Sequence, residues 1–441
     1  MLASVRTLIS RLLWLEPAWI AVLSPLILFP GRWIPASFQP AVILALFLLW
    51  PLRLFVEGLR KPLTNSPITL PVVAILLWLP INLWAAPDKA TALQACGYLA
   101  LGVALYTALV RWPPVRHSPF FLAWLVLLFG LGLSLVAPVI TDWKPEFRLF
   151  QLPAYDWLQA IPIDLGDTIH ANILAGALVL VLPIAAALSF GAPGQQPRGL
   201  RAFAFVVTFL SFGVIVLTQS RGGYLAVAAG LAVICLWRWP RLRWLVPVAL
   251  LAAAFAIQQI GPGRLLDALS GDSALGGWSG RLNIWQNSVA AFHDFVFTGL
   301  GIGAFTTVLP LMYPLKVDIA GYPHAHNLLL QIALDLGAPG LIAYLAIVIN
   351  LLLMLIPLLK RRDNVSIQEG AESAALTPAG ATRNLAAGLL GALVAMQVHG
   401  LLDAATWGNK LAFAPWLIFA FVTVLFLQRT RRGCMGGRPV P

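Results

Sequence analysis

Stretches of about 20 apolar residues recur along the whole of this 441-residue chain. A helix of about that length crosses the roughly 30 Å hydrocarbon layer of a bilayer. The composition agrees, because 60% of the residues are hydrophobic and only 10% are charged, against roughly 25% charged in soluble domains. The sequence therefore predicts an all-α polytopic membrane protein that forms a single integral membrane domain over residues 1–441.

The apolar runs predict about twelve transmembrane helices and two long connections, 141–168 and 261–340. A third connection, 360–384, is polar and basic without apolar periodicity, and we predict a flexible cytoplasmic loop there. The predicted spans are 12–30, 38–56, 68–86, 91–111, 118–140, 169–190, 201–219, 222–238, 243–260, 341–359, 385–404 and 411–428.

The distribution of charge predicts the orientation of these spans. If the N-terminus is cytoplasmic, most of the 29 Lys and Arg residues fall on the inner side, as the positive-inside rule requires. Both termini are then cytoplasmic, and all but one of the six histidines lie outside or near the outer face. The net charge of +12 does not indicate a nucleic-acid partner, because the basic residues lie in short loops between apolar runs. The three cysteines have no metal-ligand or disulfide spacing.

The long connection 261–340 is expected to carry polar chemistry on the outer side. Arg281 opens a segment in which Leu282, Trp285, Val289 and Phe292 recur at helical spacing, which predicts a short helix at the membrane surface. An interfacial anchor alone also explains that apolar face.

Two histidines, His324 and His326, precede a leucine-rich helical pattern in the same connection. We expect His326 in the first helical turn, where the helix field favours an anionic ligand and lowers the pKa of an imidazole. A neutral imidazole there can act as a general base. The alternative is that both histidines are polar interfacial residues with satisfied hydrogen bonds.

Arg221 lies in a tight turn, Thr218–Leu225, between two predicted spans. Because an arginine at the membrane boundary is costly unless it is paired or reaches the interface, Arg221 and Arg281 are candidates for binding a pyrophosphate by bidentate contacts. The alternative is that each arginine pairs with a carboxylate on the outer side.

Two further polar pairs are predicted at the outer ends of spans. His170 and Asn172 begin the span 169–190, and His399 and Asp403 are one turn apart near the end of the span 385–404. A His–Asp pair at this spacing is often only a structural hydrogen bond.

The histidine segment resembles the signature of the O-antigen ligase and O-antigen polymerase superfamily of bacterial membrane glycosyltransferases. That signature is His, then Asn, Ser or Gln, nine residues, Gly, two residues, and then Gly, Thr or Tyr. His326-Asn327, nine residues, Gly337, two residues and Gly340 match it.

Two other segments resemble the same family. Arg221, three residues and Leu225 match a second signature, and the stretches 279–285 and 299–303 are similar to the family as well. The resemblance covers residues 168 to 345 closely and the first five spans only in topology.

The resemblance implies a metal-independent, GT-C-type transferase of the bacterial inner membrane, with an extracytoplasmic active site and no cofactor. The donor would be a glycan on undecaprenyl pyrophosphate, and the acceptor lipid A-core or another glycan. His326 would be the general base, and Arg221 and Arg281 would bind the pyrophosphate. His324, Asn327, Tyr322 and His170 are candidate substrate-binding residues.

Other functions stay open at this point. A polymerase would use the same donor chemistry with a different acceptor. A polysaccharide or lipid transporter or flippase would place polar groups near the bilayer midplane, whereas the midspan positions here are nearly all apolar. A non-enzymatic scaffold would not need arginines at the membrane boundary.

Overall fold

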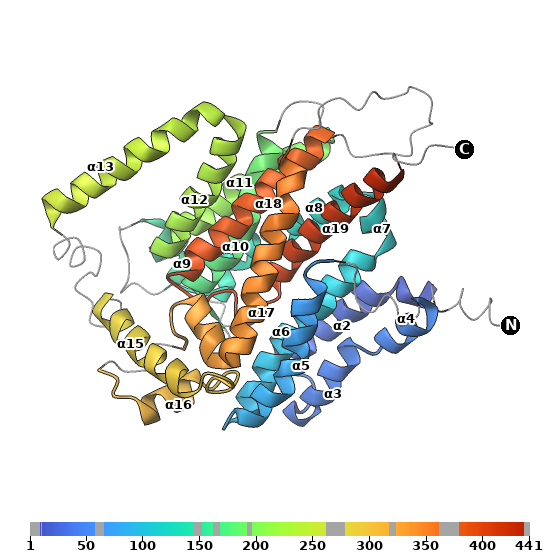
Figure 1. The fold of residues 1–441 in the computed structure, drawn as a ribbon, viewed down its shortest axis with the longest axis vertical. Helices are drawn as coiled ribbons and strands as arrows, with labels where there is room; N and C mark the ends of the chain where they lie inside the picture. The colour runs from blue at the N-terminus through green and yellow to red at the C-terminus, as the bar shows by residue number, and fades with distance from the viewer. Residues whose placement is uncertain are drawn as a thin grey trace.

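A computed structural model of the protein describes residues 9, 11–57, 66–143, 152–161, 168–191, 196–261, 278–316, 323–360 and 379–435. The described residues are mainly helical (Figure 1). Two short strands, β1 (Thr141–Asp142) and β2 (Ile169–His170), pair in parallel, with Asp142 opposite His170.

The helices follow the apolar runs of the sequence. The α-helices are α2 (Glu16–Leu28), α3 (Gln39–Leu46), α4 (Trp50–Glu57), α5 (Thr69–Ala85), α6 (Lys89–Arg111), α7 (Pro113–His117), α8 (Phe120–Ile140), α9 (Ala154–Gln159), α10 (Ala171–Ser189), α11 (Arg198–Thr218), α12 (Arg221–Arg238), α13 (Leu245–Ile260), α15 (Trp278–Asp294), α16 (Phe305–Met312), α17 (Leu328–Leu359), α18 (Ala379–Gly400) and α19 (Ala414–Met435), and the 3-10 helices are η1 (Ala36–Phe38) and η3 (Pro240–Trp244).

Among the residues described, eight helices are long and apolar enough to cross a membrane, and three further apolar helices are shorter. This confirms the prediction of an all-α membrane protein. The count of twelve spans and the GT-C type stay predictions. The helix expected after Arg281 is confirmed as α15.

The predicted loop 360–384 is wrong for its last residues, because α18 begins at Ala379. Residues 361–378 lie outside the described part of the chain.

The centre of the bundle is α18, which packs against α10 and α12 and also contacts α17 (Figure 1). The contact between α12 and α18 needs glycine on both helices. A Cβ built on Gly230 would lie 2.8 Å from the carbonyl oxygen of Gly391, and one on Gly391 would lie 2.8 Å from that of Gly230. Close backbone approach through glycine is usual between membrane helices. It brings the start of α12 beside the end of α18.

Helix α17 is broken at Gly337, whose φ of +67° is left-handed. Because of the break, the N–H of Ala338 donates to the carbonyl of Val296 at 2.7 Å, and the N–H of Leu300 donates to the carbonyl of Leu334 at 2.7 Å. The segment that follows α15 therefore bridges the break. The sequence predicted a leucine-rich helix before the span 341–359, and the non-helical Gly337 separates two helical parts of α17 at this place.

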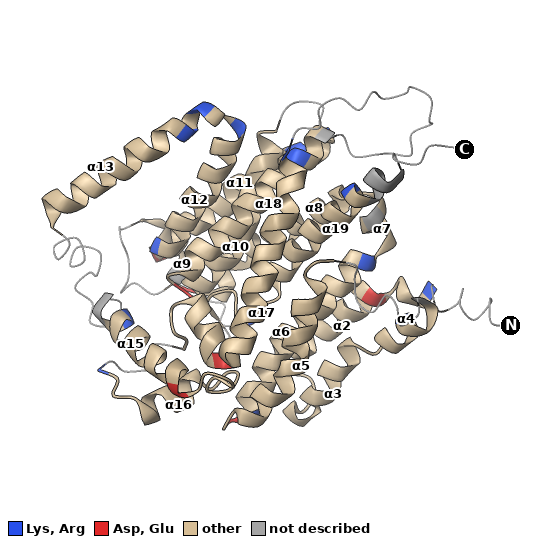
Figure 2. Cartoon of the chain, viewed as in Figure 1, with Lys and Arg blue, Asp and Glu red and all other residues tan. Residues whose placement is uncertain are grey.

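The two ends of the bundle differ in charge (Figure 2). Arg238, Arg241, Arg243 and Arg383 lie where α12 ends, η3 follows and α18 begins. We call this the basic end. Helix α13 extends away from the bundle near this end, and none of its residues is buried (Figure 1).

Candidate functional site

Asp403 lies in the turn after α18, at the end of the bundle opposite to the basic end, and is only 3% exposed. Its Oδ1 is 3.3 Å from Nε2 of His324, and its Oδ2 is 3.6 Å from Nδ1 of His326. Asn172, in the first turn of α10, donates from Nδ2 to Oδ2 at 3.0 Å. One buried carboxylate therefore joins α10, the turn after α18 and the segment before α17. We call these four residues the Asp403 cluster, and this end the site end.

Hydrogen bonding assigns the tautomer of His324. Its Nδ1 accepts from the backbone N–H of His326 at 3.2 Å, so the proton of the neutral ring is on Nε2 and faces Asp403. Burial lowers the pKa of His324 from 6.5 to about 4, although the Asp403 carboxylate opposes this shift. His326, His170 and Arg281 lower the pKa further. His324 is therefore neutral at physiological pH, with its Nε2 proton on the side of the carboxylate.

Asp403 is held in its ionised form. Burial alone would raise the pKa of this carboxyl, but the rings of His324, His326 and His399, and hydrogen bonding from His326, lower it well below its usual range. The cluster thus contains a permanent negative charge that faces two imidazoles.

His326 does not lie in the first turn of α17, as expected from the sequence, but one residue before the N-cap. Asn327 is the N-cap: its Oδ1 accepts from the N–H of Leu330 at 3.0 Å, and its Nδ2 donates to the carbonyl of Leu401 at 3.2 Å. The backbone of His326 is left-handed, with φ of +48°, which costs about 1–3 kcal/mol for a residue other than glycine. This conformation directs its ring to Asp403, and the ring centroids of His324 and His326 are 4.4 Å apart.

The residue between the two histidines is anchored on both of its peptide groups. The N–H of Ala325 donates to Oε1 of Gln331 at 2.8 Å, and its carbonyl accepts from Nε1 of Trp285 on α15 at 2.8 Å. Ala325 itself is completely buried. The backbone that carries the histidines is thus tied to both α17 and α15.

Gln331 is in turn held by Asp335, a buried carboxylate in the first half of α17. Oδ1 of Asp335 accepts from Nε2 of Gln331 at 3.1 Å and from the N–H of Gly303 at 3.1 Å, and Oδ2 accepts from Nε1 of Trp407 at 2.8 Å. Sequence reasoning did not include Asp335 or Gln331 in the site. Their spacing of four residues within an apolar helix was the only signal for them.

The structure places Arg281 near the histidines. It lies on α15, one turn before Trp285, and its charge affects the pKa of His324. Arg221 is the exposed first residue of α12, where Ser220 is the N-cap and accepts from the N–H of Gly223 at 3.1 Å. A Cβ built on the next residue, Gly222, would lie 3.6 Å from Cδ2 of His399. Arg281 therefore lies on a helix that is bonded to the histidine segment, and Arg221 on a helix that contacts His399 at the end of α18.

The remaining candidates differ in how they are placed. His170 is the exposed N-cap of α10, and its Nδ1 accepts from the N–H of Asn172 at 3.2 Å. It is close enough to affect the pKa of His324. Tyr322 lies outside the described residues.

The ligand atoms of His324, His326 and Asp403 lie within 4.8 Å of one another, which is close enough to surround a cation. In the observed arrangement the Nε2 proton of His324 faces Asp403, so this nitrogen would have to lose its proton to bind a metal. The same distances allow Asp403 to form an ion pair with either ring when that ring is protonated.

An all-α bundle of membrane-crossing length, with buried histidines and a carboxylate at one end and arginines beside them, defines a polytopic membrane protein with an enzyme-like site. Residues 206–345 match the family model described as O-antigen ligase. This segment is therefore similar to the O-antigen ligase superfamily, whose members are membrane glycosyltransferase-like enzymes. No curated protein matches the chain. Arg221, Arg281 and His326 lie inside the matched segment, whereas Asn172 and Asp403 lie outside it.

Proposed function

We propose that the protein transfers a glycan from an undecaprenyl-pyrophosphate donor to an acceptor hydroxyl, as an O-antigen ligase that acts on lipid A-core. The observation that carries the proposal is the position of His326, the motif histidine, whose Nδ1 faces the ionised Asp403. A carboxylate on one ring nitrogen orients a histidine so that the other nitrogen, Nε2, can accept a proton.

The proposed step is a displacement at the anomeric carbon of the donor glycan. The acceptor oxygen forms a bond to this carbon while the bond to the pyrophosphate oxygen breaks, and the bonding electrons leave with undecaprenyl pyrophosphate. The hydroxyl proton goes to Nε2 of His326. Asp403 stabilises the imidazolium that forms, because the carboxylate is already ionised and buried beside it.

Arg281 and Arg221 bind the pyrophosphate in this proposal. Guanidinium groups stay charged and contact phosphate oxygens in pairs, and they offset the charge that develops on the leaving group. The electrostatic effect of Arg281 on His324 supports its placement beside the reacting atoms. Catalysis then needs positioning and charge rather than a metal ion.

We further propose a protein of the bacterial inner membrane with twelve spans in a GT-C-type fold, both termini cytoplasmic and the site extracytoplasmic. The concentration of arginine at the basic end, opposite to the Asp403 cluster, supports this orientation (Figure 2).

A polymerase is the second candidate, because it would use the same donor chemistry with a lipid-linked glycan as acceptor. A transporter or flippase is less well supported, since the histidines and Asp403 gather at one end of the bundle and not at its middle.

The direct test is a transfer assay with purified protein, a lipid-pyrophosphate glycan and either lipid A-core or a second lipid-linked glycan as acceptor. His326→Ala is expected to reduce transfer by roughly 10²- to 10⁴-fold. His293→Ala is the matched control, because its side chain is 89% exposed on α15. Near-normal transfer by His326→Ala would remove the general base, and product with only the second acceptor would identify a polymerase.

Donor binding is tested separately from chemistry. Arg221→Ala and Arg281→Ala are expected to weaken binding of a lipid pyrophosphate, and unchanged affinity in both variants would refute the pyrophosphate site. Transfer that persists in a chelator checks metal independence, and loss that Mg²⁺ restores would contradict it.

A further inference from the structure

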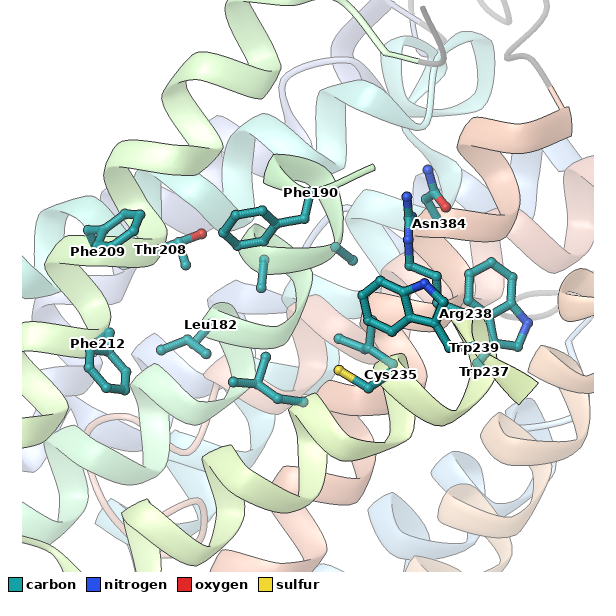
Figure 3. Close-up of a pocket in the computed structure, with 15 residues that line it drawn as sticks. Leu182, Phe190, Thr208, Phe209, Phe212, Cys235, Trp237, Arg238, Trp239 and Asn384 are labelled. Carbon is teal, nitrogen blue, oxygen red and sulfur yellow. The ribbon is translucent and has the colours of Figure 1, made fainter. Parts of the chain in front are cut away.

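A cavity of about 320 Å³ lies at the basic end, where Arg238 and Asn384 line it (Figure 3). It forms because α11 and α12, although consecutive, both pack on α10 and have little contact with each other. Its walls are almost entirely apolar and include Leu182, Phe209, Phe212, Leu231 and Ile234.

The cavity opens at the surface of the protein. Phe190, which lines it, is 57% exposed, and Phe209 is 54% exposed. The hydroxyl of Thr208 in its wall is already bonded, to the carbonyl of Ala204 at 2.7 Å and to Ser189 at 3.1 Å. The wall therefore suits a hydrocarbon chain, because the Thr208 hydroxyl is already bonded within the protein.

Two polar side chains, Arg238 and Asn384, lie together at one end of the cavity (Figure 3). The guanidinium of Arg238 lies over the ring of Trp239, 5.7 Å from its centroid. No carboxylate among the described residues forms an ion pair with Arg238. The neighbouring Arg241 and Arg243 lie on η3 and do not line the cavity.

We propose that this cavity binds one anionic phospholipid, with an acyl chain between α11 and α12 and the phosphate on Arg238. The apolar walls match the chain, and the guanidinium at the end of the cavity matches the phosphate. Basic residues near a membrane surface favour anionic lipids by about fivefold per charge. The inference is independent of the proposed function.

Cys235 lines the cavity and is half-buried, so it can report occupancy. In a Cys96→Ala, Cys434→Ala background it is the single cysteine of the chain. The protein is placed in nanodiscs of phosphatidylcholine alone or of phosphatidylcholine with phosphatidylglycerol of the same chains. N-ethylmaleimide is expected to label Cys235 severalfold more slowly with phosphatidylglycerol, since the bound lipid covers the thiol.

Arg238→Gln is expected to weaken phosphatidylglycerol binding about fivefold and to abolish most of this protection, whereas Arg238→Lys retains it. Arg241→Gln is the matched control, because Arg241 lies at the same end but does not line the cavity. Native mass spectrometry should retain one phosphatidylglycerol on the wild type and on Arg241→Gln, and about fivefold less on Arg238→Gln. Equal labelling in both membranes, or full protection in Arg238→Gln, would overturn the proposal.

Discussion

The site end and the basic end of the bundle are built on opposite principles. At the site end the carboxylates of Asp403 and Asp335 accept hydrogen bonds from α10, from α17 and from two turns. At the basic end the cavity is lined mostly by apolar side chains, with Arg238 and Asn384 at one end and the bonded hydroxyl of Thr208 in its wall. The site end depends on hydrogen bonds between individual atoms, whereas the cavity at the basic end depends mainly on its shape and charge. Substitutions of similar size should therefore differ greatly in effect between the two ends.

The largest expected effect is that of Asp403→Asn. The side chain keeps its shape but loses the charge that orients and stabilises His326, so transfer should fall on the order of 10³-fold. The measurement is the initial rate of transfer by purified protein. Asp294→Asn is the control, because this carboxylate is exposed and bonded to Tyr313. A rate within a few fold of wild type would show that the site end does not depend on this charge.

Gly337→Ala should have the next largest effect, on stability. Its Cβ would lie 2.0 Å from the carbonyl oxygen of Phe297, at a left-handed φ of +67°, so we expect a loss of about 3 kcal/mol or more. The matched substitution Gly213→Ala on α11 meets no atom within 4 Å and should be nearly neutral. Thermal unfolding in detergent measures both, and similar midpoints would contradict the tight bridge at the kink.

Asp335→Asn should cost about 1–3 kcal/mol and also slow transfer. All three groups around this carboxylate are donors, from Gly303, Gln331 and Trp407, and the new amide NH₂ would face one of them. Thr208→Val in the cavity wall removes a bonded hydroxyl at the basic end and should leave transfer unchanged. The unfolding midpoints and transfer rates of the two variants show whether individual hydrogen bonds matter for activity only at the site end. Equal losses of transfer activity in both variants would show that the two ends do not differ in this respect.

The smallest expected effect is the change in stability over a single pH unit. The folded pKa of His324 is about 4 against an ordinary 6.5, so between these values the unfolded chain binds a proton that the folded protein does not. The free energy of unfolding should then fall as pH is lowered from 6.5 to 4, by up to about 1.4 kcal/mol per unit. His324→Gln should flatten the profile of the unfolding midpoint, and His117→Gln, at an exposed position, should not. Parallel profiles for all three proteins would refute the buried neutral ring.

The helices were predictable because membrane-spanning segments are signalled by the length and composition of local sequence. Each predicted span overlaps a helix, although the span 38–56 is divided into η1, α3 and α4. The break in α17 was predictable as a helix end, because Gly337 and Pro339 are typical of one. The bridge that Val296 and Leu300 make across this break was not predictable, since no local pattern encodes it.

The candidate site was predicted only in part, because local motifs reveal single residues but not their long-range partners. His326, His324 and Arg281 were recognisable from motif and placement, and the structure brings Arg281 within electrostatic range of His324. The role of Asp403 was not recognisable, because Asn172 and Asp403 are 231 residues apart in sequence. The sequence suggested a hydrogen bond between His399 and Asp403, one turn apart. In the structure the backbone N–H of Asp403 donates to the carbonyl of His399 at 2.9 Å.

The break in α17 gives a physical meaning to the nine residues between Asn327 and Gly337. They form a half-helix of about 13 Å whose two ends are tied to different neighbours, Leu401 at the start and Val296 beyond the kink. One inserted residue would lengthen it by about 1.5 Å and rotate one end against the other by about 100°, so that Asp335 could no longer face Trp407 while Asn327 remained the N-cap. The interval therefore fixes a distance and a rotation together, and among related chains we expect its length to stay constant while the identities of its lipid-facing residues change.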